Sequence, residues 1–145
     1  MRPGLPLVAV SLALSMLACS NVSALLSPPL DCSSPPKERV HVAPGELVAA
    51  FGENVVAAEG TYGNGKLLEI TGQASRVSRD DSGSFVALRT GPIGKGKVQA
   101  YFPDSSSAAF AKVEEGQTIT VLAYLQSGAA TDKRIPLSSA CLVNP

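Results

Sequence analysis

Residues 67–77 read Leu-Leu-Glu-Ile-Thr-Gly-Gln-Ala-Ser-Arg-Val, and this stretch decides the fold that the sequence predicts. From Leu68 onward, apolar or small residues alternate with polar ones at the two-residue period of a β-strand. The alternation slips between Gly72 and Arg76 and resumes at Val77, which indicates a β-bulge. We therefore expect a long first strand with a bend near its middle.

Downstream of this strand, turn signals separate four more strands. Asp80-Asp81-Ser82-Gly83 is typical of a hairpin turn. The pattern then predicts a second strand over 85–90, a loop over 91–96 and a third strand over 98–102. A short helix over 105–113 precedes a fourth strand over 118–125. A fifth strand follows over 135–143, where Pro136 favours a strand start or an edge.

Upstream of the first strand, the sequence predicts one amphipathic helix of about four turns. Pro44 and Gly45 open it, Glu46 lies in its first turn, where the helix dipole favours a negative charge, and Gly60 is a natural stop. Apolar residues recur at steps of three and four and form its expected buried stripe: Leu47, Val48, Phe51, Val55 and Ala58.

Helix, three strands, short helix and two strands is the order of the five-stranded OB barrel. The predicted fold class is therefore mainly β: a five-stranded OB-fold barrel with an N-terminal amphipathic helix and a short helix between strands three and four. A chain of 145 residues suits one such domain, which we place at 44–145.

Several segments together resemble the tRNA_anti-like family of bacterial OB-fold proteins. They are Glu46-Leu47-Val48, Phe51, Glu53-Asn54, Ala57-Ala58, Tyr62, Lys66, 68–72, Tyr101-Phe102, 115–121 and Cys141 in the last strand. The resemblance covers about residues 45–143, is most specific over 47–72, and departs from the family at Ala123, where a glycine is common. Many family members carry lipoprotein or export signals. The family name does not itself imply that members bind tRNA.

The first 18 residues have the pattern of an export signal. Met1-Arg2 is a short positive start, and an apolar run follows from Leu5 to Leu17. Ala18-Cys19 resembles a bacterial lipobox, which implies cleavage before Cys19 and lipidation of its sulfur. Ser20 in the next position favours an outer-membrane lipoprotein that faces the periplasm. The alternative is an ordinary signal cut after Ala24, which would release a soluble periplasmic protein.

Residues 19–43 are rich in Ser and Pro and are predicted to be a semi-rigid linker. After export, Cys32 and Cys141 remain in an oxidising compartment, and we expect them to form a disulfide. The alternative is that both stay as thiols. The partner that this anchor implies is the membrane, through the lipid on Cys19.

The charge balance argues against nucleic-acid coating, because 12 Lys plus Arg face 12 Asp plus Glu. A modest basic patch with an aromatic residue is nevertheless predicted on strands two and three, the ligand face of many OB folds. This candidate ligand face comprises Arg89, Lys95, Lys97 and Tyr101.

No catalytic, metal or cofactor motif is complete. Residues 91–98 approach a P-loop but have Val98 in place of the required Ser or Thr, and His41 is the only histidine. We therefore expect no enzyme activity, metal or cofactor. The sequence predicts a non-catalytic envelope domain that binds an oligomeric ligand or an unknown envelope protein; alternatives are a structural interaction protein or a weak oligonucleotide-binding module.

Overall fold

The long, bent strand that the sequence predicts is β2 (Leu67–Asp80) in a computed structural model that describes residues 30–91 and 98–144. Its first half, from Leu67 to Gln73, pairs antiparallel with β5 (Thr118–Leu125). Its second half, from Ala74 to Asp80, pairs antiparallel with β3 (Gly83–Leu88). The register shifts between Ala74 and Arg76, so the predicted bulge is confirmed. One strand thereby joins two sides of a barrel.

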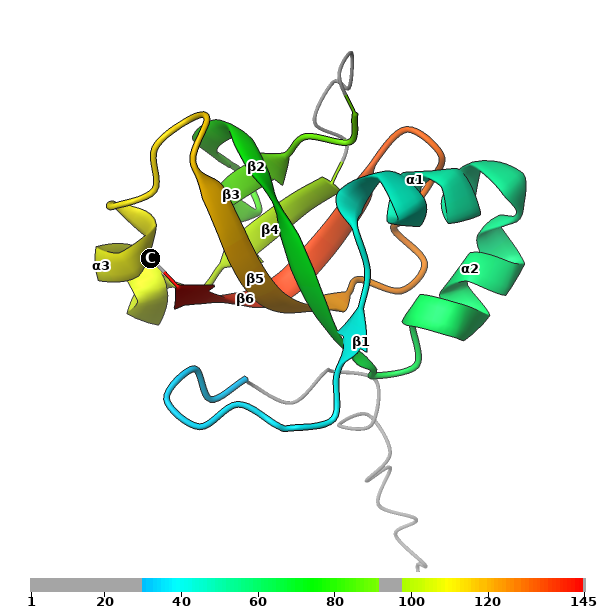
Figure 1. The fold of residues 1–145 in the computed structure, drawn as a ribbon, viewed down its shortest axis with the longest axis horizontal. Coiled ribbons are helices and arrows are strands. Elements are labelled where there is room, and N and C mark those ends of the chain that lie inside the picture. The colour runs from blue at the N-terminus through cyan, green and yellow to red at the C-terminus, as the bar shows by residue number, and fades with distance from the viewer. Residues whose placement is uncertain (1–29, 92–97, 145) are drawn as a thin grey trace, which may run out of the picture.

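The remaining pairings close the barrel (Figure 1). β3 pairs antiparallel with β4 (Val98–Phe102), and β4 pairs parallel with β6 (Ile135–Asn144). β6 then returns antiparallel to β5. The predicted five-stranded OB barrel is confirmed in its order and strand positions. β3 ends at Leu88, two residues before the predicted end.

The barrel interior contains the alternating apolar residues of all five strands. Its largest fully buried side chains include Leu68, Ile70, Leu88, Ile119, Val121, Ile135 and Leu137. Smaller apolar clusters lie on the outer side of the sheet: Leu67, Leu122, Tyr124 and Cys141 form one, and Phe85, Ala87 and Tyr101 form the other.

The predicted single N-terminal helix is wrong, because two helices replace it: α1 (Pro44–Glu53) and α2 (Val55–Tyr62). Asn54 between them has extended backbone, and its side chain accepts a hydrogen bond from the Ala57 amide at 3.1 Å. Asn is among the preferred residues for this helix-capping position. This cap starts a second helix at a position where the apolar spacing predicted that the first helix would continue.

The break changes which apolar residues are buried. Leu47 and Phe51 of α1 and Ala58 of α2 enter the core, as predicted, but Val55 is exposed. Its neighbour Val56 is 80% exposed. The predicted stop at Gly60 is also wrong, since α2 continues to Tyr62 and Gly63 caps it through a hydrogen bond from its amide to the Glu59 carbonyl.

A helical turn stands between strands β4 and β5, as predicted, but it is shorter. The 3-10 helix η2 (Asp104–Ser106) runs into α3 (Ser107–Phe110). Phe110 packs against Phe102 of β4, with ring centroids 5.6 Å apart. Figure 1 shows α3 on the opposite side of the barrel from α1 and α2.

Part of the predicted linker belongs to the packed structure. β1 (Val40–His41) pairs parallel with Leu68 and Glu69 of β2, and Val42 is buried. Arg39 donates a hydrogen bond to the Glu69 carboxylate at 2.8 Å. We call residues 30–39 the N-terminal strap. A disulfide joins Cys32 of this strap to Cys141 of β6, 109 residues later in the chain, so the pairing that the sequence predicted is present in the structure.

The predicted signal peptide and the predicted lipidation site at Cys19 lie outside the described residues. Within the described ranges, none of the helices has the length and hydrophobicity to cross a membrane.

Candidate functional site

The outer surface of β2, β3 and β4 holds Tyr101, one of the two residues of the predicted ligand face that the structure describes. After the bulge, Arg76 and Ser78 of β2 lie beside Ala87 and Phe85 of β3. These in turn pair with Gln99 and Tyr101 of β4. Because side chains alternate between the two sides of a strand, this set shares the face opposite the barrel interior.

Tyr101 lies at the centre of a polar network on this face. Its hydroxyl donates a hydrogen bond to Asp80 Oδ2 at 2.6 Å, and Gln99 Oε1 is 3.3 Å away. Arg134, just before β6, donates from Nε to Gln99 Oε1 at 2.6 Å and from Nη2 to the Tyr101 hydroxyl. The guanidinium carbon is 5.8 Å from the centre of the Tyr101 ring. We call Asp80, Gln99, Tyr101 and Arg134 the Tyr101 network.

The Tyr101 ring is a support for this network and not a stacking platform. It is only 8% exposed and packs against Phe85, with ring centroids 5.3 Å apart. An aromatic ring that stacks on a base or sugar must present a free face. Here the groups that remain accessible are polar: the Arg134 side chain is 50% exposed and the Asp80 side chain 38%.

The network shifts the pKa values of its two acidic groups in opposite directions. The hydrogen bond from Tyr101 lowers the pKa of Asp80, and the nearby Arg134 charge adds to this effect. Burial raises the pKa of Tyr101, and the Asp80 hydrogen bond raises it further. At neutral pH, Asp80 therefore stays ionised and Tyr101 stays protonated.

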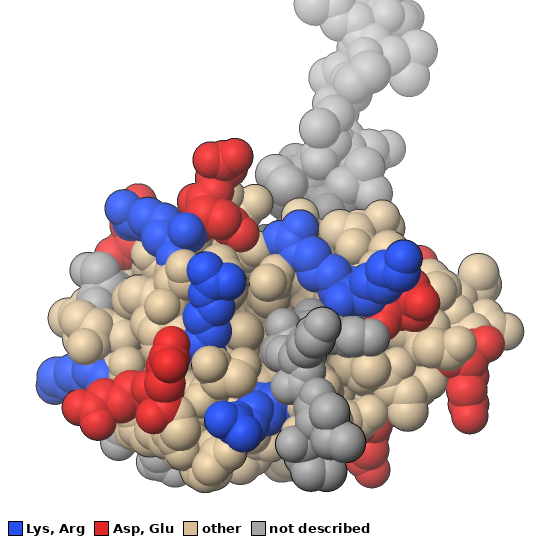
Figure 2. All heavy atoms as spheres, turned by 90° about the horizontal axis from the view of Figure 1, so that it is seen from above, with Lys and Arg blue, Asp and Glu red and all other residues tan. Residues whose placement is uncertain are grey.

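The structure does not bring the whole predicted face together. Lys95 and Lys97 lie outside the described residues. Arg89 is exposed, but it lines a groove of about 460 Å³ beside the start of α1, with Gln73 and Thr90. Among the described residues, no hydrogen bond or ion pair links Arg89 to the Tyr101 network. Figure 2 shows Lys and Arg side chains spread over the end of the molecule seen from above.

Sequence reasoning missed three members of the network. The pattern around Asp80 indicates only a turn, and its contact with Tyr101 crosses from β2 over β3 to β4. Gln99 shares the strand and the face of Tyr101, so its two-residue spacing could have identified it. Arg134 lies 33 residues after Tyr101, and nothing in the local pattern marks it.

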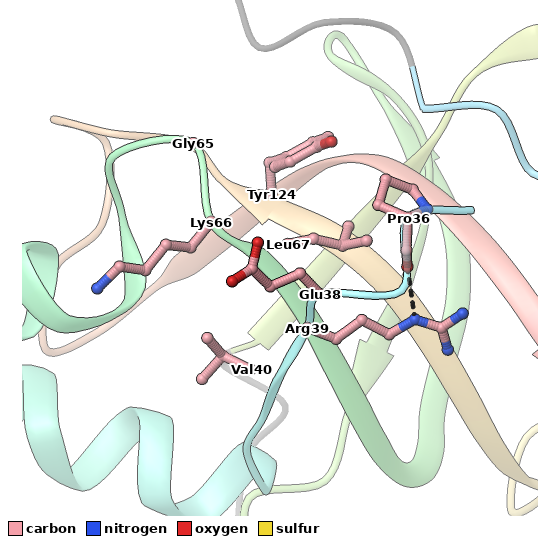
Figure 3. Close-up of a pocket in the computed structure, with 8 residues that line it drawn as sticks. All are labelled: Pro36, Glu38, Arg39, Val40, Gly65, Lys66, Leu67 and Tyr124. Carbon is pink, nitrogen blue, oxygen red and sulfur yellow. Dashed lines mark hydrogen bonds between the residues drawn. The ribbon is translucent and has the colours of Figure 1, made fainter.

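A second groove, of about 590 Å³, lies on another part of the surface (Figure 3). Its walls come from the N-terminal strap, β1, the start of β2 and Tyr124 of β5. No groove residue belongs to the Tyr101 network. Among the described residues, no group of three His, Cys, Asp or Glu side chains is placed to hold a metal ion.

A family model named tRNA_anti-like matches residues 5–133 of this sequence. The chain belongs to the tRNA_anti-like family. The resemblance drawn from its motifs is thereby confirmed.

Solved structures show the fold of this tRNA_anti-like chain in other proteins. A proposed nucleic acid-binding lipoprotein from Klebsiella pneumoniae matches with a TM-score of 0.63 and 16% identity. The match covers 77% of this chain and 100% of that protein. At this level of identity, the likeness shows the shared fold.

More distant matches are to other proteins of solved structure. A proposed aspartyl-tRNA synthetase from Leishmania major matches with a TM-score of 0.44 and 16% identity, over 81% of this chain and 23% of that one. An OBody bound to hen egg-white lysozyme matches with a TM-score of 0.46 and 14% identity, over 58% of this chain and 86% of that one. No curated protein sequence matches the chain.

Proposed function

We propose that this tRNA_anti-like protein is a non-catalytic ligand-binding domain of the bacterial cell envelope. Its ligand lies across the outer face of β2, β3 and β4 and contacts Arg134, Asp80 and Gln99. The observation that carries this proposal is the fixed position of Arg134, which Gln99 and Tyr101 hold in place while half of the side chain remains exposed. A side chain that is already ordered loses less conformational entropy when a ligand binds.

Binding fits this face better than catalysis. A general acid or base works best when its pKa is near the working pH. The pKa of Asp80 is lowered and that of Tyr101 is raised, so both move away from neutrality. These groups are suited to offering fixed hydrogen bonds to a polar ligand.

The ligand is an oligomer rich in hydrogen-bonding groups. The network offers a donor in Arg134, an acceptor in Asp80 and a group of both kinds in Gln99. Asp80 also offsets much of the charge of Arg134, since the two groups are 3.9 Å apart. A polar oligomer such as a glycan fits this balance better than a polyanion, whose binding depends on uncompensated positive charge.

The proposal is tested by binding at low and near-physiological salt. Fluorescent single-stranded DNA and a mixture of soluble peptidoglycan fragments serve as probes, with wild-type protein and Arg134→Ala. We expect saturable binding of the fragments that weakens at least tenfold in Arg134→Ala. The matched control is Arg79→Ala, since Arg79 pairs with Asp104 outside the network. Salt-sensitive DNA binding without fragment binding would instead support the oligonucleotide alternative, and equal binding by Arg134→Ala would exclude this face.

We also propose that Cys19 carries the lipid anchor, which the likeness to a lipoprotein of the same fold supports. Intact mass and membrane fractionation of wild type and Cys19→Ser test this. We expect a triacylated Cys19 and release of the variant from the outer-membrane fraction. A mass that corresponds to cleavage after Ala24, unchanged by the substitution, would show a soluble periplasmic protein.

A further inference from the structure

From the groove beside the N-terminal strap, we infer a second binding site, for a small aliphatic amine. This site is separate from the proposed ligand face. The groove of about 590 Å³ is within the size range of small-molecule sites. It is lined by Pro36, Glu38, Arg39, Val40, Gly65, Lys66, Leu67 and Tyr124.

The charged side chains of the groove differ in whether they already have a partner. Arg39 donates from Nη1 to Glu69 at 2.8 Å and from Nε to the Pro36 carbonyl at 2.9 Å. Lys66 donates from Nζ to the Thr61 and Gly60 carbonyls at the end of α2, at 2.9 and 3.3 Å. Glu38 makes no hydrogen bond or ion pair with any residue in the described ranges. Of the three charged side chains that line the groove, Glu38 is therefore the one without a polar partner among the described residues.

The directions of these side chains agree with that account. Figure 3 shows the Lys66 side chain and the Arg39 guanidinium extending away from the groove on opposite sides. The Glu38 carboxylate lies between them and points toward Lys66 and the start of β2 at Leu67.

The rest of the lining suits the stem of an alkyl amine. Pro36 and Val40 offer apolar surface for methylene groups, and Leu67 and Tyr124, which are 5% and 6% exposed, complete the apolar lining. An ammonium group gains from a carboxylate through a charge-assisted hydrogen bond. 1,5-Diaminopentane offers an ammonium group to Glu38 and methylene groups to this apolar surface.

The site is tested by titrating ¹⁵N-labelled, disulfide-bonded protein with 1,5-diaminopentane and recording amide shifts. We expect saturable shifts at Val40, Gly65 and Lys66, and binding at least tenfold weaker for 1,5-pentanediol, which lacks the charge. Glu38→Gln should weaken amine binding at least tenfold. Glu38 is exposed, so this substitution leaves the core unchanged.

Two matched variants show whether an effect on amine binding belongs to this groove. Glu53→Gln removes an exposed carboxylate at the end of α1 and should leave binding unchanged. Arg134→Ala should also leave it unchanged, so failure of the proposed ligand face and failure of this site are distinguishable. Unaltered amine binding by Glu38→Gln, or equal binding of the diol, would overturn the inference. Binding of N-acetyl-lysine amide tenfold tighter than the diamine would overturn the small-amine assignment in favour of a peptide lysine.

Discussion

Tyr101 shows how one residue can be placed correctly by sequence and still differ in role from the prediction. The alternation of β4 puts it on the outer face, as expected. Its burial depends on Phe85 and Arg134, which come from other parts of the chain. A two-residue period reports the side of a strand and carries no information about what covers that side.

Removal of the Tyr101 hydroxyl should destabilise the fold. Tyr101→Phe keeps the ring packing but leaves Asp80 and Arg134 without their shared partner. We expect a loss of about 1–2 kcal/mol in the free energy of unfolding, measured by urea denaturation. Tyr62→Phe is the control, because the Tyr62 hydroxyl has no hydrogen bond within the described residues, and it should change stability by only a few tenths of a kcal/mol.

The Asp80 carboxylate should make stability depend on pH. Its pKa is lowered in the folded state by the Tyr101 hydrogen bond, so its ionised form stabilises the fold. This contribution is complete above the usual aspartate range and is lost as the pH falls through the lowered folded-state pKa. The difference in unfolding free energy between wild type and Asp80→Asn should therefore shrink as the pH falls from 7 toward 3. Asp81→Asn should show no such trend, and a difference that stays constant with pH would contradict the assignment.

At the scale of elements, the start of α1 depends on a glycine in β2. A Cβ atom added to Gly72 would lie 2.7 Å from Cγ of Pro44, the first residue of α1. Gly72→Ala must move the helix or the strand, and we expect a loss of about 1–3 kcal/mol in thermal or urea unfolding. A Cβ atom added to Gly60 of α2 would meet no atom within 4 Å, so Gly60→Ala should instead gain about 0.5–1 kcal/mol. Equal effects of the two substitutions would contradict this contact.

The break between α1 and α2 depends on the side chain of Asn54. Asn54→Ala removes the acceptor for the Ala57 amide, and we expect a cost of about 1 kcal/mol in urea unfolding. Asn54→Asp keeps an acceptor and should retain most of the stability. If both variants unfold at the same urea concentration as wild type, the cap is not what separates the helices.

The sequence was sufficient to predict the strands. It was not sufficient to predict the break between the two helices or the contacts between residues that are far apart in the chain. Strands of five or more residues have enough period-two repeats to be recognised, as in β2 and β5. β1 has only two residues, and its pairing with Leu68 and Glu69 is a tertiary contact. The helix break was missed because Val55 and Ala58 continue the three- and four-residue spacing across Asn54. Asp80, Gln99 and Arg134 of the Tyr101 network were missed because their contacts join separate parts of the chain or depend on the side chain of Tyr101.

For the whole molecule, the disulfide closes a loop of most of the domain. The chain-entropy account gives about 4.7 kcal/mol for a loop of ~100 residues as an upper figure. We expect Cys32→Ser with Cys141→Ser to lower the unfolding free energy by about 2–4 kcal/mol in urea titrations while the far-ultraviolet circular dichroism stays native. The barrel core contains neither Cys32 nor the rest of the strap, so loss of the native spectrum would contradict this picture.

If Cys19 carries the proposed lipid anchor, the disulfide also sets how far the domain can travel from the membrane. Cys32 comes 13 residues after Cys19, and an extended chain of 13 residue steps spans at most about 47 Å. Without the bridge and with the strap released, the first fixed point is Val40, which gives 21 residues and about 76 Å. For a lipid-anchored chain, reduction of the disulfide would enlarge the volume that the domain can search about fourfold. The effective concentration of the domain near membrane-bound partners would fall by the same factor. The redox state of one bond would then determine which layer of the envelope the domain can reach.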